Sequence, residues 1–170
     1  MEIIDCHAHI YSPDEKRYPT TKNPLRVPGG NASIEDLRTL SLAHGVTAIR
    51  PVQTVSFYGY DNRYLCDAVQ AHPAWTAGVC TLDPDDPKSP DVLRRCVQEY
   101  GVKTLRSTPG NNRTTFDHDG VRLLWKTCAE LGATVDIFLM STAWVPRAEK
   151  LLRGFRQLTV GLGGCLGVRP

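Results

Sequence analysis

The sequence predicts an α/β protein whose parallel strands alternate with helices, as they do in part of a (β/α)8 TIM barrel. Short apolar runs rich in β-branched residues alternate with amphipathic segments, three of which end at a glycine. The hexapeptide GVTAIR at Gly45 recurs as GVKTLR at Gly101, a spacing of 56 residues that equals two βα units of about 28 residues each. A recurring strand preceded by a helix-ending glycine is typical of this fold class.

The length limits how much of a barrel the chain can form. A complete (β/α)8 barrel takes about 250 residues, whereas this chain has 170 residues. We therefore expect a single domain over residues 1–170 that forms an incomplete barrel of about six parallel strands and five helices. An open doubly wound parallel sheet is the alternative.

Six apolar runs supply the expected strands, and β-branched residues occur in each of them. They begin with EIIDCHAHI and occupy residues 2–10, 45–52, 75–84, 101–110, 133–140 and 157–162. Because most of these runs are continuously apolar, we expect both faces of the sheet to be covered by other elements.

Five amphipathic segments supply the expected helices, at residues 34–43, 62–72, 91–100, 118–131 and 145–155. The starts of the first four are marked by the capping box Ser33–Asp36, by Asp61, by the run Ser89-Pro90-Asp91 and by Asp117. The ends of the same four are marked by Gly45, Pro73, Gly101 and Gly132. The fifth helix has the weakest signals.

A long loop is expected after the first strand. Residues 11–32 contain four prolines and the pair Gly29-Gly30, which exclude a regular element there. A loop of this length in a compact domain is usually functional or disordered. Since it leaves the carboxyl end of a strand, where barrel enzymes build their active sites, we expect a lid or substrate-binding loop, with disorder as the alternative.

The composition indicates a soluble globular protein, with 41% hydrophobic and 22% charged residues. Its 20 basic residues are scattered among 18 acidic ones, so no cationic face for nucleic acid is expected. The sequence shows no apolar run of membrane-spanning length and no basic segment of a signal peptide, and its six cysteines form no CxxC pair. We therefore expect reduced thiols, a cytoplasmic location and a small molecule as ligand.

The residues that directly follow each strand are expected at the functional end of the sheet. Strand alternation places Asp5, His7 and His9 on one face of the first strand. Two imidazoles at this spacing suit a divalent metal, with zinc favoured, and the alternative is a histidine pair hydrogen-bonded to loop backbone. The candidates for a third ligand at the same end are His118 and Asp83.

Two arginines are expected at the same end of the sheet. Arg50 lies near the end of the second strand, close to Gln53, and Arg106 lies near the end of the fourth. A planar guanidinium can bind both oxygens of a carboxylate, so both arginines are candidates for binding a carboxylated substrate. The alternative is an ion pair with a nearby acid such as Asp83. Asp136, within the fifth strand, receives no role.

Three segments resemble the amidohydrolase-related hydrolases in the same order along the chain. These are IIDCHAHIYSP, YGYDNRYLCDAVQAHPAWTAGVCTLDPDDP and YGVKTLRST. That family of (β/α)8 barrels includes lactonases of dicarboxylates and some decarboxylases. The resemblance implies a hydrolase of a small carboxylated lactone or amide, in which His7 and His9 bind the metal and Arg106 binds the substrate. The metal would activate a water molecule, although some lactonases of the family work without metal.

The chain also departs from the family's pattern. Members carry another histidine near the end of strand five and Asp-His at the end of strand six, where this chain has Phe138-Leu139-Met140 and Gly163-Gly164. The chain ends at Pro170, before the aspartate that members carry after strand eight. Three hypotheses therefore stand beside each other: a divergent or truncated hydrolase (or decarboxylase), an inactive half-barrel that binds a partner or forms homo-oligomers through open sheet edges, and a fragment of a longer protein.

Overall fold

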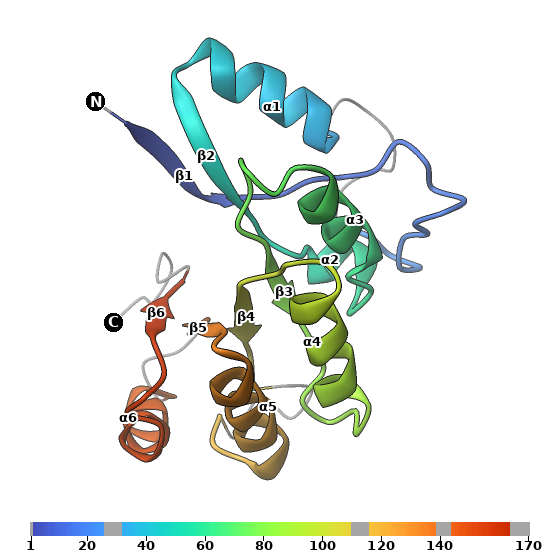
Figure 1. The fold of residues 1–170 in the computed structure, drawn as a ribbon. Helices are drawn as coiled ribbons and strands as arrows, with labels where there is room; N and C mark the ends of the chain where they lie inside the picture. The colour runs from blue at the N-terminus through green and yellow to red at the C-terminus, as the bar shows by residue number, and fades with distance from the viewer. Residues whose placement is uncertain (1, 26–31, 110–115, 139–143, 164–170) are drawn as a thin grey trace. The chain divides into compact units, whose positions relative to one another are not determined.

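The structure is a computed structural model, and it describes residues 2–25, 32–109, 116–138 and 144–163 (Figure 1). The predicted α/β class is confirmed, because strands alternate with helices in the described residues and the strand pairs given below are parallel. The chain divides into two compact units. Unit 1 comprises Met1–Thr81 with Tyr100–Val102, and unit 2 comprises Leu82–Glu99 with Lys103–Pro170.

Unit 1 contains three strands and three helices among its described residues. In chain order they are β1 (Ile3–Ala8), α1 (Ile34–Ala43), β2 (Val46–Pro51), α2 (Val55–Tyr58), α3 (Arg63–Ala71) and β3 (Val79–Thr81). β1 and β2 are parallel, and isolated parallel bridges join Ile49 to Thr76 and Val52 to Val79. The short helix α2 was not predicted, because four residues are too few to show a helical period.

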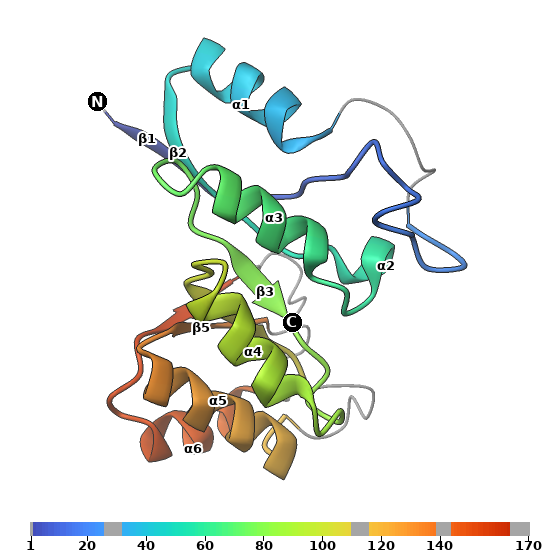
Figure 2. The same ribbon diagram turned by 45° about the vertical axis from the view of Figure 1, so that its right-hand side comes forward.

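Unit 2 contains the other three strands and three helices among its described residues (Figure 2). They are α4 (Ser89–Gln98), β4 (Thr104–Ser107), α5 (Asp119–Leu131), β5 (Thr134–Ile137), α6 (Val145–Gly154) and β6 (Val160–Leu162). β4, β5 and β6 form consecutive parallel pairs. The part of the predicted fifth strand at residues 139–140 lies outside the described residues.

The repeated glycine signal is confirmed at the ends of two helices. Gly45 and Gly101, which open the repeated hexapeptide, have φ angles of 73° and 75°. Residues with a Cβ rarely adopt this conformation, so glycine lets the chain leave the helix and enter the next strand.

Two predicted helix starts differ in detail from the structure. The Ser33 hydroxyl accepts the Asp36 N–H as predicted, completing the capping box. Ser89, however, lies inside α4, and its hydroxyl donates to the Asp83 carbonyl 2.5 Å away. Asp61 precedes the cap position of α3, but its carboxylate accepts the Arg63 N–H at 3.0 Å and therefore still serves the first turn of the helix.

Each unit has an apolar core beside its strands. In unit 1, five buried residues pack together, namely Ile10, Ile34, Ile49, Ala68 and Trp75. In unit 2, Leu105, Val135 and Ile137 on the strands are fully buried, as is Trp125 of α5. The Trp125 Nε1–H donates to the Ser107 hydroxyl at 2.9 Å, which fixes the register of α5 on β4.

The loop after β1 is ordered over its described part. The Tyr11 N–H donates to the Ala32 carbonyl, and the Thr21 N–H donates to the Phe57 carbonyl. The Tyr18 hydroxyl donates to Asp67 at 2.5 Å. These hydrogen bonds connect the described part of the loop to other segments, and residues 26–31 lie outside the described part of the chain. A lid or substrate-binding role of the loop stays a prediction. None of the helices in the described ranges has the length and apolar character needed to cross a bilayer.

Candidate functional site

The two histidines of the first motif lie side by side at the end of β1. Their ring centroids are 5.0 Å apart and the rings are nearly perpendicular, at 86°. Ala8 and Ile10, on the opposite face of the chain, are buried in the helix-side layer. His7 is exposed and His9 is half-buried, so burial alternates over residues 7–10, whereas the pairing of β1 with β2 is irregular between Asp5 and Ala8.

A backbone carbonyl indicates the tautomer of His9. His9 Nδ1 lies 2.9 Å from the Val52 carbonyl oxygen. Since a carbonyl oxygen only accepts, Nδ1 must carry the proton of this hydrogen bond. In the neutral ring, Nε2 then carries the lone pair, which is the arrangement found in metal-binding histidines.

The histidine pair fits part of a metal site. Among the described residues, no group of three or more His, Cys, Asp or Glu side chains is arranged to hold a metal ion. Catalytic zinc sites usually have three protein ligands. The described residues therefore supply two imidazoles of the expected chemistry and not a complete set of ligands.

The two predicted third ligands have other roles in unit 2. His118 Nε2 lies 3.0 Å from the Pro109 carbonyl oxygen, so its ring binds the backbone that follows β4. Asp83 Oδ1 accepts the Asp85 N–H at 3.0 Å, which makes an Asx turn. Neither belongs to a cluster of possible metal ligands within the described residues, and a third ligand from either of them stays a prediction.

Gln53 also has a structural role. Its buried side-chain amide donates to the Gly59 carbonyl at 3.2 Å and to the Asp61 carbonyl at 2.5 Å. It therefore fixes the turn between α2 and α3. Arg50 is half-buried on β2, next to the core residue Ile49 and hence on the opposite face of the strand. Its role in substrate binding stays a prediction.

In unit 2, strand register places Arg106 in a defined row. The paired positions across the three strands are Arg106 on β4, Asp136 on β5 and Gly161 on β6. Leu105 and Ile137 alternate with them and are fully buried on the other face. We call the row of Arg106, Asp136 and Gly161 the inner row.

The surroundings of Arg106 suit the binding of an anion. Its guanidinium carbon lies 4.4 Å from the centre of the Phe138 ring, which is cation–π geometry. Burial lowers the pKa of Arg106 from its usual value, and the negative charge of Asp136 acts in the opposite direction. The guanidinium remains charged at neutral pH, because even a lowered arginine pKa stays far above 7.

Asp136 is the residue of this row that sequence reasoning missed. A Cβ placed on Gly161 would lie 2.6 Å from Asp136 Oδ1, so the carboxylate occupies the space that a side chain at residue 161 would need. The alternation of TVDI gives the face of Asp136 but not its neighbours. Only the register of β4, β5 and β6 places it beside Arg106.

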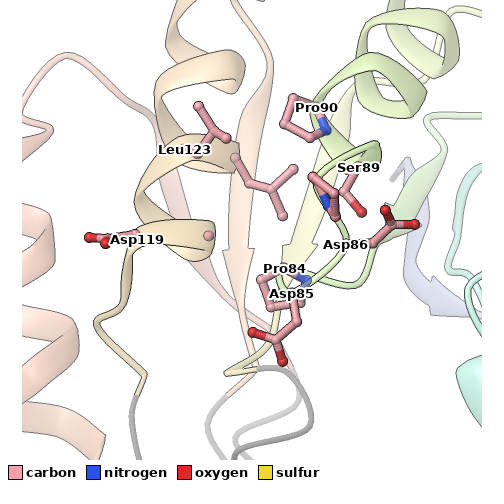
Figure 3. A pocket seen from close by; sticks show the side chains of 10 residues that line it. Pro84, Asp85, Asp86, Ser89, Pro90, Asp119 and Leu123 are labelled. Atoms are coloured by element: carbon pink, nitrogen blue, oxygen red, sulfur yellow. The ribbon is translucent and has the colours of Figure 1, made fainter.

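Unit 2 also contains a pocket of about 180 Å³ (Figure 3). It lies between the loop after β3 and the first turns of α4 and α5. Gly120 allows this approach, because a Cβ there would lie 1.8 Å from the Pro84 carbonyl oxygen. The lining includes the carboxylates of Asp85, Asp86 and Asp119, together with Leu123. The predicted site residues are not part of the lining.

Comparison with known proteins assigns a family and a fold. A family model described as Amidohydrolase matches residues 4–162. One similar solved structure is a probable 2-pyrone-4,6-dicarboxylic acid hydrolase from Acinetobacter baumannii, with citric acid bound. Its sequence identity to this chain is 19% and the TM-score is 0.74, and the match covers 94% of this chain and 57% of that protein's chain. A protein of Pseudomonas putida, provisionally named as the same hydrolase, is 25% identical with a TM-score of 0.71, covering 94% and 55%.

A third solved structure is a 5-carboxyvanillate decarboxylase from Novosphingobium aromaticivorans with bound manganese and 3-methoxy-4-hydroxy-5-nitrobenzoic acid. It is 18% identical with a TM-score of 0.60, covering 93% of this chain and 58% of its own. The chain thus spans little more than half the length of these proteins. The comparison confirms the prediction of an incomplete barrel, since the chain matches part of these larger structures.

Proposed function

The chain belongs to the amidohydrolase family, and from this premise we propose that it acts as a hydrolase on a small carboxylated lactone or amide. The observation that carries the proposal is the half-buried guanidinium of Arg106, placed over Phe138 and beside Asp136. A partly desolvated guanidinium attracts a carboxylate more strongly than an exposed one, because less water screens the two charges. Two similar structures carry the name of a dicarboxylic acid hydrolase, which supports a carboxylated substrate.

Arg106 and Arg50 are assigned to substrate binding in this proposal. Each presents five N–H donors in a planar fork, and a dicarboxylate offers two groups that match such forks. Arg106 is the candidate for binding a carboxylate from the inner row of unit 2, and Arg50, on β2 of unit 1, is a separate candidate for binding a carboxylate.

His7 and His9 are assigned to a divalent metal. The proton on His9 Nδ1 is held by the Val52 carbonyl, so Nε2 is the atom that would bind a metal. A bound metal would lower the pKa of a water molecule and polarise the carbonyl of the substrate. Imidazole ligands favour zinc, and the manganese of the decarboxylase supports a divalent metal in general.

Decarboxylation is the second enzymatic candidate, because one similar structure is a decarboxylase of a carboxylated aromatic compound. The two reactions differ in their products. Hydrolysis opens a ring or splits an amide and keeps every carbon atom, whereas decarboxylation releases CO2.

The test uses 2-pyrone-4,6-dicarboxylate and 5-carboxyvanillate as alternative substrates of the 170-residue chain. We expect loss of pyrone absorbance without CO2 release, and in Arg106→Gln we expect a large rise in KM. Arg94→Gln is the matched control, because Arg94 makes a surface ion pair with Glu130 at 3.1 Å. CO2 release from 5-carboxyvanillate would select the decarboxylase, and turnover unchanged in Arg106→Gln would remove Arg106 from the site.

A non-catalytic assembly protein is the alternative outside enzymology. It is favoured by apolar side chains exposed on β1 and β6, where Ile4 is 52% and Leu162 is 66% exposed. Apolar residues on such strands favour association with a second copy. Sedimentation distinguishes the two: a defined oligomer without turnover of either substrate supports assembly, and a monomer that turns over substrate excludes it.

A further inference from the structure

Gly161 of β6 and Gly163, the residue that follows β6, both lie near the carboxylate of Asp136 on β5. A Cβ on Gly161 would lie 2.6 Å from Asp136 Oδ1, which is closer than real Cβ atoms come to other heavy atoms. A Cβ on Gly163 would lie 3.5 Å from both Asp136 Cβ and Asp136 Oδ2, which is ordinary van der Waals contact. The absence of a side chain at residue 161 therefore leaves room for the carboxylate of Asp136 in its present position.

The position of this carboxylate is coupled to Arg106. The two residues are register partners on neighbouring parallel strands and point to the same face. The charge of Asp136 acts on the guanidinium of Arg106. The ring of Phe138, the residue that follows β5, contacts the same guanidinium. Arg106 is thus bounded by an aromatic ring and by a carboxylate whose place is set by Gly161.

We propose that Asp136 is a positioning residue that orients the Arg106 guanidinium for a substrate carboxylate, and that Gly161 is required because it leaves room for the Asp136 carboxylate. This inference rests on the proposed function, in which Arg106 binds the substrate. It adds that Asp136 sets the direction in which the N–H donors of the Arg106 guanidinium point.

The physical reason is the geometry of the guanidinium. The group binds a carboxylate best when two parallel N–H donors face both oxygens, and this requires a fixed rotation about the side-chain axis. A ring contact on one face leaves the guanidinium able to rotate about its Cζ–Nε bond. A fixed carboxylate restrains that rotation, because it holds one edge of the fork and directs the other edge away from itself.

Two glycine variants separate the position of the carboxylate from its charge. Gly161→Ala forces the Asp136 carboxylate to move, because the added Cβ would lie 2.6 Å from Asp136 Oδ1, and it neither adds nor removes a charge. The atom that must move is the end of a side chain, so the strand does not have to shift. Gly163→Ala introduces the same methyl group two residues later on the same face, at contact distances that need no movement. It is the matched control, and Asp136→Asn removes the charge itself.

The first measurement is made on the ligand-free chain and does not depend on any substrate. Nitrogen-15 NMR of arginine side chains reports rotation about the Cζ–Nε bond, with the Arg106 signal assigned by its loss in Arg106→Lys. We expect slow rotation in the wild type and in Gly163→Ala, and rotation at least severalfold faster in Asp136→Asn and Gly161→Ala. Rotation that is unchanged in Asp136→Asn overturns the proposal.

The second measurement is the affinity for isophthalate, a stable six-membered ring with two carboxylates. We expect Asp136→Asn and Gly161→Ala to bind it about tenfold more weakly, with Gly163→Ala near wild type. If Asp136→Asn binds isophthalate as tightly as wild type or more tightly, Asp136 only neutralises charge and the proposal is overturned. If Gly161→Ala matches wild type, the position of the carboxylate is irrelevant and the proposal is also overturned. If wild type shows restricted rotation but binds no isophthalate, the proposed function fails while the orientation of Arg106 by Asp136 stands.

Discussion

The two units hold the ends of their strands in different ways. In unit 1, polar side chains fix the loops that follow the strands: Asn62 Nδ2 donates to the Thr81 carbonyl at 2.9 Å, and its Oδ1 accepts the Thr81 N–H at 3.0 Å. The Ser12 N–H likewise donates to the Tyr58 hydroxyl at 2.7 Å. In unit 2, the strands rest on a dry layer in which Leu105 and Trp125 have no exposed surface.

This difference predicts how each part of the candidate site fails. The histidine pair of unit 1 depends on directional hydrogen bonds, since the Val52 carbonyl holds the ring of His9. The inner row of unit 2 depends on strand register, which the packed layer beneath it maintains. Removal of a hydroxyl should therefore lower the stability of unit 1, and removal of buried apolar volume should lower the stability of unit 2.

The largest effect is expected from Trp125→Ala. The substitution leaves a cavity under β4 and removes the partner of the Ser107 hydroxyl. Large-to-small substitutions of buried aromatic residues cost about 3–5 kcal/mol. We expect a loss of this size in the free energy of unfolding, measured by urea denaturation. Trp125→Phe keeps most of the apolar area, and its loss should be near 1–2 kcal/mol. Equal losses in both variants would show that packing is not what holds unit 2.

The second effect is on metal affinity at the histidine pair. His9→Ala removes the ring whose Nε2 is directed by Val52, and we expect zinc affinity to fall by at least about 100-fold. His44→Ala is the control, because His44 is exposed at the end of α1. Isothermal titration with zinc measures both. Equal zinc affinity in His9→Ala and wild type would mean that the pair binds no metal, and the hydrolase would then have to work without it.

The sequence was sufficient for the order of the six strands and of the five longer helices, although not for the short helix α2. Gly45 and Gly101 could be assigned because a helix-ending glycine has a local backbone cause, a positive φ. The histidine pair could be placed on one face because the two-residue period of a strand is local as well. Each of these predictions needs only a few consecutive residues.

The contacts of the candidate site needed the folded chain. The carboxyl end of a strand could be predicted for Gln53, Asp83 and His118, but not that their side chains bind nearby backbone. The role of Asp136 depends on which residue of β6 is its partner, and strand register is set by pairing between distant segments. Gly161 therefore showed no signal in the sequence, although it decides where the carboxylate lies.

The smallest effect is expected from Tyr58→Phe, which tests whether side-chain hydrogen bonds hold the loops of unit 1. Tyr58→Phe leaves the Ser12 N–H without its acceptor, and a buried donor left unsatisfied costs about 1–2 kcal/mol. We expect a loss of this size at neutral pH by urea denaturation. The control is Tyr100→Phe, which removes a hydroxyl from a half-buried tyrosine in the short segment Tyr100–Val102 of unit 1.

The same tyrosine predicts a dependence on alkaline pH. Burial raises the pKa of Tyr58 from 10.0 to about 12 in the folded chain. The folded state then holds the phenolic proton more tightly than the unfolded state, so stability is complete below pH 10 and falls as the pH rises towards 12. The loss attributable to Tyr58 should be about 1–2 kcal/mol, and Tyr58→Phe should remove it. If the alkaline loss is the same in Tyr58→Phe and wild type, Tyr18, whose pKa burial also raises to about 12, becomes the group to test in unit 1. If neither Tyr58→Phe nor Tyr18→Phe changes the loss of stability at alkaline pH, the tyrosine hydroxyls do not hold the loops of unit 1. The contrast with unit 2 then fails.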